Sequence, residues 1–368
     1  MPTDQSFWIT NGRLIVPDGE RRGALCIRNG RIAAIRPSVP RGARTLSARG
    51  QWIAPGFVDL HIWGDPAVVA REAVKGGTTA FLTAIGPEAP EKLIEKLAGL
   101  GPSSELDGAR CLGAHLEGPF VNPAQAGALP PKWMRPVVAK ELTQLLRHAA
   151  AIKVITLAPE LPGALEAIPK LTRRGIAVSL GHSRADADTV SRAAAAGATL
   201  VTHLFNGMRP LHHREPGLLG AALMDPRLTA MVILDGVHIS TDAFRLALLC
   251  KGVDRLILET DSIRHQRPLR ASYERGAYYV PRPAWNAGKP TLAGSGLTMI
   301  EAVRNAVRFA KISLGDAVRM ASLHPARAIR QAGRFGAITV GRPADVVCFD
   351  EAFRVTRTLI AGRVVYQR

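Results

Sequence analysis

Residues 176–204 read IAVSLGHSRADADTVSRAAAAGATLVTHL, and the order of patterns in this stretch decides the predicted fold. Two short apolar runs, 176–181 and 199–204, have the length and composition of buried strands. The segment between them, RADADTVSRAAAAG, has a helical pattern. A strand, a helix and a second strand in this order indicate a parallel sheet whose strands are joined by helices.

The same alternation continues through the middle of the chain. The other six predicted strands are 55–61, 79–85, 110–116, 153–158, 229–234 and 255–260. Helical patterns such as PEKLIEKLAGL and AKELTQLLRHAA fall between most of them. Eight strands alternating with helices favour a (β/α)8 TIM-type barrel over an open sheet. In such barrels the catalytic groups come from the carboxyl ends of the strands.

Both ends of the chain have a different character. Residues 7–54 form short strand patterns, with hairpin signals at Asn11-Gly12 and Asn29-Gly30. The C-terminal ADVVCFD, FRVTRTLIAG and RVVYQR are also strand-like. We therefore predict that segments 1–54 and 338–368 join in one small β-sandwich domain, and that 55–337 forms the barrel domain. A long loop, 262–290, and two helical stretches follow the eighth strand.

Composition narrows the class of protein. The chain has 368 residues, 47% of them hydrophobic and 21% charged, as in soluble globular proteins. The N-terminus lacks a basic segment followed by an apolar region, so we expect no secretory signal. No apolar run approaches the roughly 20 residues that span a bilayer. A cytoplasmic enzyme with no membrane partner is the simplest prediction.

The net charge of +18 comes mainly from arginines scattered along the chain. This distribution favours a basic surface or an anionic substrate over a nucleic-acid-binding tail. No nucleic-acid motif accompanies the charge, so no nucleic-acid partner is expected. The four cysteines are far apart and show no CxxC spacing, which indicates reduced thiols rather than zinc ligands or disulfides.

Five polar residues lie at the ends of five of the predicted strands: His61, Glu117, His182, His203 and Asp261. Imidazole nitrogens and carboxylate oxygens are ligands of zinc-like divalent ions, and a catalytic site keeps one position open for water. Glu117, His182 and His203 are the predicted ligands of one such ion. A bound water would have a lowered pKa and could attack a substrate near neutral pH. Asp261 is the predicted proton shuttle between that water and a leaving nitrogen.

Two further polar residues near strand ends are expected to support the structure rather than to act in catalysis. His115 alternates with Glu117 on the same predicted strand, and we expect it to support the site or the fold rather than bind metal. Glu160 follows the fourth strand in LAPE and is also interpreted as structural.

Several motifs, taken in order, resemble the N-acetylglucosamine-6-phosphate deacetylase family of the amidohydrolase superfamily. They are PGFVDLHIWG, GAHLEGPFVNP, SLGHSRA, VTHLFNGMRPLHHREPGLLGAAL, LDGVHIS, LETDS, TLAGSGLTM, SLHPARAI and GRPADVVCFD. The resemblance covers nearly the whole chain. It implies a metal-dependent amide hydrolase that releases acetate from an N-acetylamino sugar phosphate and contains one divalent ion, with zinc expected and iron or another divalent ion as alternatives.

The resemblance also implies roles for individual residues. Glu117, His182 and His203 match the main metal ligands, and Asp261 matches the catalytic aspartate. The implied substrate-binding residues, which line the sugar-phosphate site or contact phosphate and sugar hydroxyls, are Asn206, Gly207, Arg214 and His238. Part of this site can come from a neighbouring subunit in dimeric members, so a homodimer is implied.

The chain departs from the family pattern in the metal motif. Members with two metals have an HxH pair, whereas this chain has His61 and Trp63. One-metal members also lack the pair. We therefore expect one tightly held ion, with His61 as a weak or vestigial ligand.

The substrate loop departs as well. It reads Gly127-Ala128-Leu129 where the family usually has a GAH-like triplet, so Ala128 and Leu129 occupy the substrate-contacting positions. Leu129 cannot donate a hydrogen bond, and this leaves substrate identity open. Another amino sugar, an N-acyl amino acid or a cyclic amide is the alternative substrate, and a non-catalytic binding protein with the same fold is the alternative class.

The loop after Asp261 is unusually basic. Over the pocket it would favour an anionic substrate, and the alternative is a solvated surface hairpin. Its basic residues are Arg264, His265, Arg267, Arg270 and Arg275, with Tyr278 and Tyr279 close behind.

Overall fold

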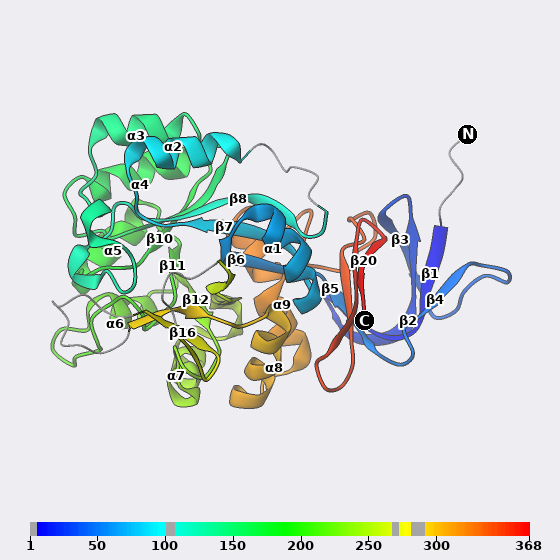
Figure 1. Ribbon diagram of the computed structural model, residues 1–368. Coiled ribbons are helices and arrows are strands. Elements are labelled where there is room, and N and C mark those ends of the chain that lie inside the picture. The colour runs from blue at the N-terminus through cyan, green and yellow to red at the C-terminus, as the bar shows by residue number, and fades with distance from the viewer. Residues whose placement is uncertain (1–5, 101–106, 267–271, 281–290) are drawn as a thin grey trace.

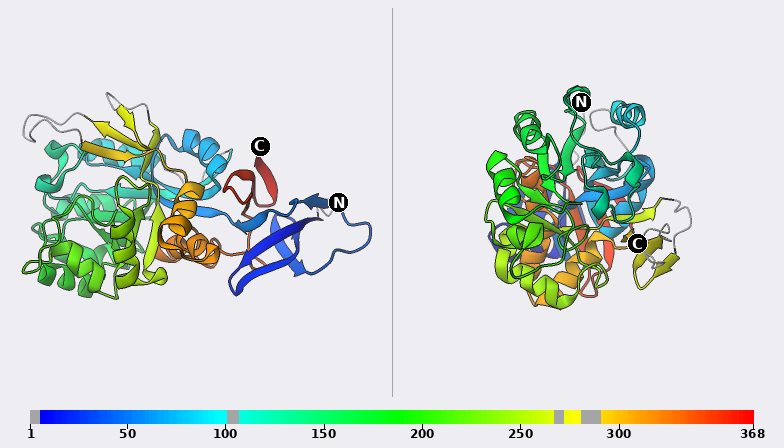
Figure 2. Two further views of the ribbon diagram at one scale, coloured as in Figure 1. Left: turned by 90° about the horizontal axis from the view of Figure 1, so that it is seen from below. Right: turned by 90° about the vertical axis from the view of Figure 1, so that its left-hand side faces the viewer.

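The computed structural model describes residues 6–100, 107–266, 272–280 and 291–368. These residues form two sheets, one in each of two parts of the molecule (Figures 1 and 2). Helices surround the larger sheet, and the smaller sheet lies at one end and carries the C-terminus. Within the described ranges, every helix falls short of the length and apolarity that a bilayer crossing requires.

The larger sheet begins with eight parallel strands that confirm the predicted alternation. They are β6 (Phe57–Gly64), β7 (Thr78–Ile85), β8 (Arg110–Glu117), β9 (Ile152–Leu157), β10 (Ala177–Leu180), β11 (Leu200–Val201), β12 (Thr229–Ile233) and β13 (Leu256–Glu259). Their order in the sheet follows their order in the chain. Neighbouring strands pair in parallel because each is followed by a crossover that returns the chain to the same end of the sheet.

The sheet curls, and its eighth strand returns to its first. After β13 the chain passes through Thr260 and Asp261 into β14 (Ser262–His265), which pairs in parallel with β6. The backbone N–H of Asp261 donates to the carbonyl of His61 at 2.9 Å. This is a curled α/β arrangement in which the carboxyl ends of the strands meet at one end of the sheet.

Helices cover the outer face of the curled sheet (Figure 1). They are α1 (Pro66–Ala73), α2 (Pro90–Gly99), α3 (Ala139–Leu146), α4 (Ala164–Arg173), α5 (Ala187–Ala196), α6 (Gly217–Met224), α7 (Thr241–Lys251), α8 (Met299–Ala310), α9 (Leu314–Ala321) and α10 (Leu323–Ala328). The main core lies between these helices and the strands. A second apolar cluster joins β6, β7, β9, β11, β12 and β13 to α10, so the strands are buried on both faces.

The loop after the eighth strand contains a hairpin. It consists of β15 (Ser272–Glu274) and β16 (Ala277–Val280), and β16 pairs antiparallel with β17 (Thr291–Ser295), which pairs in turn with β14. The hairpin extends from the larger sheet on the side away from the terminal sheet (Figure 2, left). The predicted loop 262–290 is therefore partly a strand extension of the larger sheet.

The smaller sheet contains strands from both ends of the chain. Its strands are β1 (Ser6–Val16), β2 (Gly19–Arg28), β3 (Arg31–Arg36), β4 (Thr45–Ser47), β5 (Trp52–Pro55), β18 (Val346–Phe349), β19 (Val355–Ile360) and β20 (Arg363–Gln367). The β-sandwich is not confirmed, because these strands form one sheet. The eleven-residue β1 pairs antiparallel with β2 on one side and in parallel with β4 and β5 on the other, so no break separates two layers.

Candidate metal centre and active site

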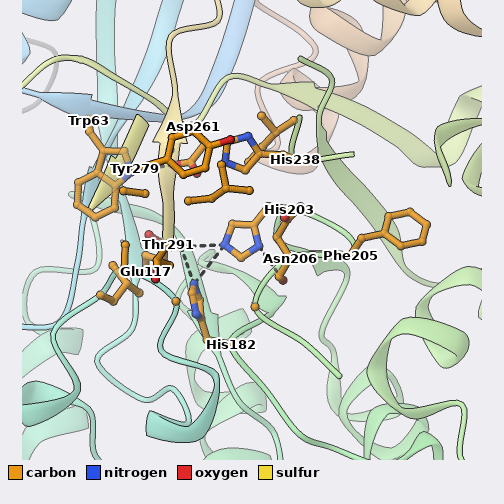
Figure 3. Close-up of a pocket in the computed structure, with 18 residues that line it drawn as sticks. Trp63, Glu117, His182, His203, Phe205, Asn206, His238, Asp261, Tyr279 and Thr291 are labelled. Atoms are coloured by element: carbon orange, nitrogen blue, oxygen red, sulfur yellow. Dashed lines mark hydrogen bonds and ion pairs between the residues drawn. The ribbon is translucent and has the colours of Figure 1, made fainter. Parts of the chain in front are cut away.

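The predicted metal ligands come together at the carboxyl ends of three strands. Glu117 is the last residue of β8, and His182 and His203 follow β10 and β11 within two residues. One oxygen of Glu117, Oε1, lies 2.8 Å from Nε2 of His182 and 2.9 Å from Nε2 of His203. The two Nε2 atoms are 3.2 Å apart (Figure 3). The three side chains are buried and offer ligand atoms that all lie within 4.8 Å of one another.

The other ring nitrogen of each histidine faces a backbone carbonyl. Nδ1 of His182 lies 2.7 Å from the carbonyl oxygen of Gln125, and Nδ1 of His203 lies 3.1 Å from that of Asn206. Because a carbonyl only accepts, these contacts assign the proton to Nδ1 and leave the Nε2 lone pair toward Glu117. Two imidazole lone pairs and a carboxylate oxygen then converge, a donor set that suits a divalent cation.

The electric field of the site also favours positive charge. Burial opposes protonation of His203, but Glu117, Asp261 and Glu259 outweigh it and raise the pKa of the imidazole. Burial likewise opposes ionisation of Glu117, but the positive charge of His61, together with the close approach of His182 and His203, holds the pKa of the carboxyl well below its usual range. A cation at this point would meet an ionised carboxylate.

Three of the site residues have strained backbones. His182, His203 and Asp261 have φ angles of +46°, +30° and +47°, in the left-handed region that favours glycine. Each such residue costs on the order of 1 kcal/mol or more, and strain of this kind gathers at functional sites. These turns lie where the strands end, and all three side chains line the same pocket.

A pocket of about 450 Å³ opens beside the three ligands. Its walls include most of the residues predicted to bind substrate and the predicted proton shuttle: Ala128, Leu129, Asn206, Gly207, His238 and Asp261. Arg214 is not among the lining residues. Its side chain is exposed and contacts the imidazole of His213 instead.

Asp261 lies at the edge of this pocket between β13 and β14. Burial and the charge of Glu117 raise the pKa of its carboxyl, and His61, His203 and His238 oppose the rise only in part. One of its oxygens, Oδ1, accepts a hydrogen bond from the indole Nε1–H of Trp63 at 2.8 Å. A carboxyl with a raised pKa can take up and release a proton nearer to neutral pH.

His61 lies beneath the pocket and is fully buried. Its Nε2 is 3.3 Å from Oε2 of Glu117 and 3.6 Å from Oδ1 of Asp261. It therefore faces the oxygen of Glu117 that points away from His182 and His203. This position keeps His61 outside the three-ligand cluster but next to it.

His238 is held by a carboxylate that the sequence analysis did not single out. Asp235 accepts from Nδ1 of His238 at 2.7 Å and also from the backbone N–H groups of Val237 and His238. The pair leaves Nε2 of His238 as the polar atom that can face the pocket. The sequence pattern that could have predicted this contact is the three-residue spacing of Asp235 and His238 in DGVH.

His115 and Glu160 have structural contacts. Nδ1 of His115 lies 2.9 Å from the carbonyl of Leu60 and Nε2 lies 2.7 Å from Oγ1 of Thr156, while burial holds the pKa of the ring well below its usual value. Glu160 accepts from Oγ of Ser183 at 2.7 Å and from the backbone of Arg184 at 2.6 Å. Glu160 thus fixes the loop that follows His182.

The hairpin and β17 contribute a wall that sequence reasoning did not foresee in detail. Tyr279, Thr291 and residues 292–294 line the pocket. Arg264 and Arg275 are exposed, and the remaining loop arginines predicted near the site, Arg267 and Arg270, lie outside the described residues. Tyr279 on β16 therefore brings an aromatic ring of this loop to the pocket.

The chain belongs to the amidohydrolase family, whose pattern its residues 52–365 match. Among similar proteins, an N-acetylglucosamine-6-phosphate deacetylase of Bacillus subtilis is 34% identical, with 96% of this chain and 95% of that protein covered. An N-acetylgalactosamine-6-phosphate deacetylase of Escherichia coli O157:H7 is 33% identical, with 92% and 94% covered. The resemblance seen in the motifs is confirmed.

The fold agrees with this relationship. The crystal structure of N-acetylglucosamine-6-phosphate deacetylase from Pasteurella multocida superimposes with a TM-score of 0.87 at 29% identity, covering 99% of this chain and 100% of that one. Both the metal-dependent hydrolase class and the arrangement of the two sheets are thus shared with enzymes that cleave a carbon–nitrogen bond.

Proposed function

We propose that the protein is a metal-dependent amide hydrolase that removes the acetyl group from an N-acetylamino sugar phosphate. The convergence of Glu117, His182 and His203 beside Asp261, in one pocket, carries this proposal. The similar proteins act on the gluco or the galacto form of such a substrate by name. Either isomer is therefore a candidate for this chain.

In this proposal Glu117, His182 and His203 hold one divalent ion, with zinc as the expected metal. When bound, such an ion polarises the amide carbonyl and lowers the pKa of water. The carbonyl groups of Gln125 and Asn206 keep the two imidazoles oriented with Nε2 toward the ion site. His61 lies close enough to Glu117 to influence it by charge and is proposed as a weak ligand at most.

Asp261 is the proposed proton carrier. Hydrolysis of an amide requires a base that takes a proton from the attacking water and an acid that delivers one to the departing nitrogen. A single carboxyl can do both in turn. The raised pKa of Asp261 favours the second step, because the protonated form persists closer to neutral pH.

The substrate is proposed to lie along the wall formed by Ala128, Leu129, Asn206 and Gly207, with His238 opposite. We propose that His238, which Asp235 orients, contacts a substrate hydroxyl or the developing oxyanion. Arg214 lies outside the pocket of its own chain, so we propose that it contacts the phosphate in the pocket of a partner chain. This proposal requires the homodimer that the sequence resemblance implies.

A second candidate keeps the chemistry and changes the substrate. Leu129 lines the pocket at a position where a hydrogen-bond donor would fix a polar substituent. An apolar side chain there allows a related enzyme that deacylates another anionic N-acyl substrate, such as an N-acyl amino acid. The exposed Arg264 and Arg275 are proposed to attract the anion in either case.

A substrate panel tests these proposals. Acetate release is measured with N-acetylglucosamine 6-phosphate, N-acetylgalactosamine 6-phosphate and unphosphorylated N-acetylglucosamine, on protein of known zinc content. Turnover of a phosphorylated sugar, absent without phosphate, supports the first candidate. Inactivity on all three by zinc-loaded protein would refute it and favour the second.

We further propose the domain division of the sequence analysis, with 1–54 and 338–368 as one unit and 55–337 as a complete TIM-type barrel. The pairing of β14 with β6 and of β5 with β18 supports it. The interpretation of the terminal strands as a β-sandwich and the cytoplasmic location both stay predictions. Limited proteolysis followed by mass spectrometry would test the boundaries near 54 and 338.

A further inference from the structure

Trp63 makes a directed contact with the proposed proton carrier. It lies at the end of β6, and its indole Nε1–H donates to Oδ1 of Asp261 at 2.8 Å. The side chain is partly exposed to the pocket, which it helps to line (Figure 3). A hydrogen bond to a carboxylate at this distance is of the charge-assisted kind, stronger than one between neutral groups.

The backbone around Asp261 is already fixed by β6 and β17. The N–H of Asp261 donates to the carbonyl of His61 at 2.9 Å, and its carbonyl accepts from the N–H of Ser295 at 2.9 Å. Asp59 on β6 accepts from Oγ1 of the adjacent Thr260 at 2.6 Å. These bonds set where the Cα of Asp261 lies, but they leave the rotation of its side chain free. The indole restricts that rotation.

The indole ring is itself held in one place. A Cβ atom on Gly86 would lie 3.1 Å from Cη2 of Trp63 and 3.3 Å from Cδ2 of Leu129. The ring of Trp63 and the side chain of Leu129 therefore both pack closely over Gly86, where an added Cβ atom would be tight. A ring confined in this way keeps its N–H pointed in one direction.

We infer that Trp63 is a positioning residue that holds Oδ1 of Asp261 and so presents the other oxygen, Oδ2, for proton exchange with the substrate. The inference rests on the proposed amide hydrolysis. Simple space filling is the competing explanation, but a phenylalanine ring would fill most of the place beside Leu129. What tryptophan adds is the N–H group, and that group points at the carboxylate.

Trp63→Phe tests the inference, because it removes the N–H and keeps an aromatic ring. We expect kcat for acetate release to fall about ten-fold while KM changes less than about two-fold, since only the orientation of the proton carrier is lost. Zinc content per chain should stay at the wild-type value. The matched control is Trp52→Phe, in the terminal sheet, where the indole N–H approaches Glu351 at 3.5 Å and the ring lies under the Arg13 guanidinium, away from the pocket.

A spectroscopic readout tests the hydrogen bond without turnover. The chain has five tryptophans, so protein labelled with 15N at the indole nitrogen gives few signals, and the one lost in Trp63→Phe belongs to Trp63. In Asp261→Ala this signal should move upfield and exchange faster with solvent, because its acceptor is gone. The Trp52 signal should stay in place.

The outcomes separate the inference from the proposed function. A wild-type kcat in Trp63→Phe overturns the inference, and so does a fall in kcat that is matched by loss of zinc. If wild-type protein releases no acetate from any sugar, the proposed function fails. The NMR spectra then test the hydrogen bond between Trp63 and Asp261 without turnover. A Trp63 signal that is unchanged in Asp261→Ala would then overturn the contact itself.

Discussion

Gly207→Ala should weaken metal binding through a single added methyl group. Gly207 follows the loop of His203 and has a φ of +62°. A Cβ atom there would lie 3.1 Å from Nδ1 of His182 and 3.3 Å from Cε1 of His203. Both imidazoles would have to give way by a few tenths of an ångström, and both are proposed metal ligands.

Two costs follow from this geometry. The left-handed backbone costs alanine roughly 1–2 kcal/mol of stability. Displacement of His182 also disturbs its 2.7 Å contact with the Gln125 carbonyl, which orients the ring. Loss of such an orienting contact typically weakens metal affinity about 10- to 100-fold. We therefore expect a lower thermal midpoint and a zinc affinity reduced by a factor in that range.

Gly217→Ala is the matched control. Gly217 has a φ of +60°, and the nearest atom to an added Cβ is the Ala185 carbonyl oxygen at 3.6 Å, an ordinary contact. It should share the backbone cost and keep the zinc affinity of wild-type protein. Affinity is measured by competition with a chromogenic chelator, and stability by thermal unfolding without metal. If Gly207→Ala binds zinc as tightly as Gly217→Ala, the assignment of the metal site is wrong.

Three other changes have defined outcomes. Trp63→His creates a second imidazole two residues after His61. Elemental analysis should then show the metal content rising from about one toward about two equivalents per chain. An unchanged metal content would contradict this prediction. Asp345, just before β18, lies 3.2 Å from Arg110. Burial raises the pKa of its carboxyl, and Arg110 opposes this rise only in part. The protonated form of Asp345 therefore stabilises the fold at low pH, and this stabilisation is lost as the pH rises above the usual value of 3.8. Asp345→Asn should thus gain thermal stability relative to wild type with rising pH, and the opposite slope would mean that the ion pair with Arg110 dominates. Replacing Arg264 and Arg275 with glutamine should raise KM for a phosphorylated substrate several-fold with little change in kcat, most clearly at low salt, and an unchanged KM would assign these residues to a solvated hairpin.

The alternation of strands and helices was predictable because the strands are short apolar runs. Most residues of the strands from β6 to β13 are buried, so apolar residues dominate these runs and distinguish them from the helices around them. The polar residue that ends a run is then conspicuous. For this reason Glu117, His182, His203 and Asp261 could be grouped before their distances were known.

Other features depend on contacts between distant segments, which no local pattern encodes. The sequence marked Trp63 only as a missing histidine, and its hydrogen bond spans 198 positions to Asp261. The single terminal sheet depends on how β1 pairs with three other strands, and hairpin signals do not specify that pairing. Arg214 matched a phosphate-contacting motif, yet its side chain lies outside the pocket of its own chain.

Asp261→Asn gives the most direct test of the central claim, that one metal centre and one proton carrier act together in this pocket. The amide keeps the shape of the side chain and can still accept from Trp63, but it cannot carry the proton. We expect wild-type protein with about one zinc per chain to release acetate from a phosphorylated N-acetylamino sugar. The variant should keep its zinc and lose kcat by a factor on the order of 100 or more. A zinc-loaded Asp261→Asn protein with wild-type kcat would contradict the account.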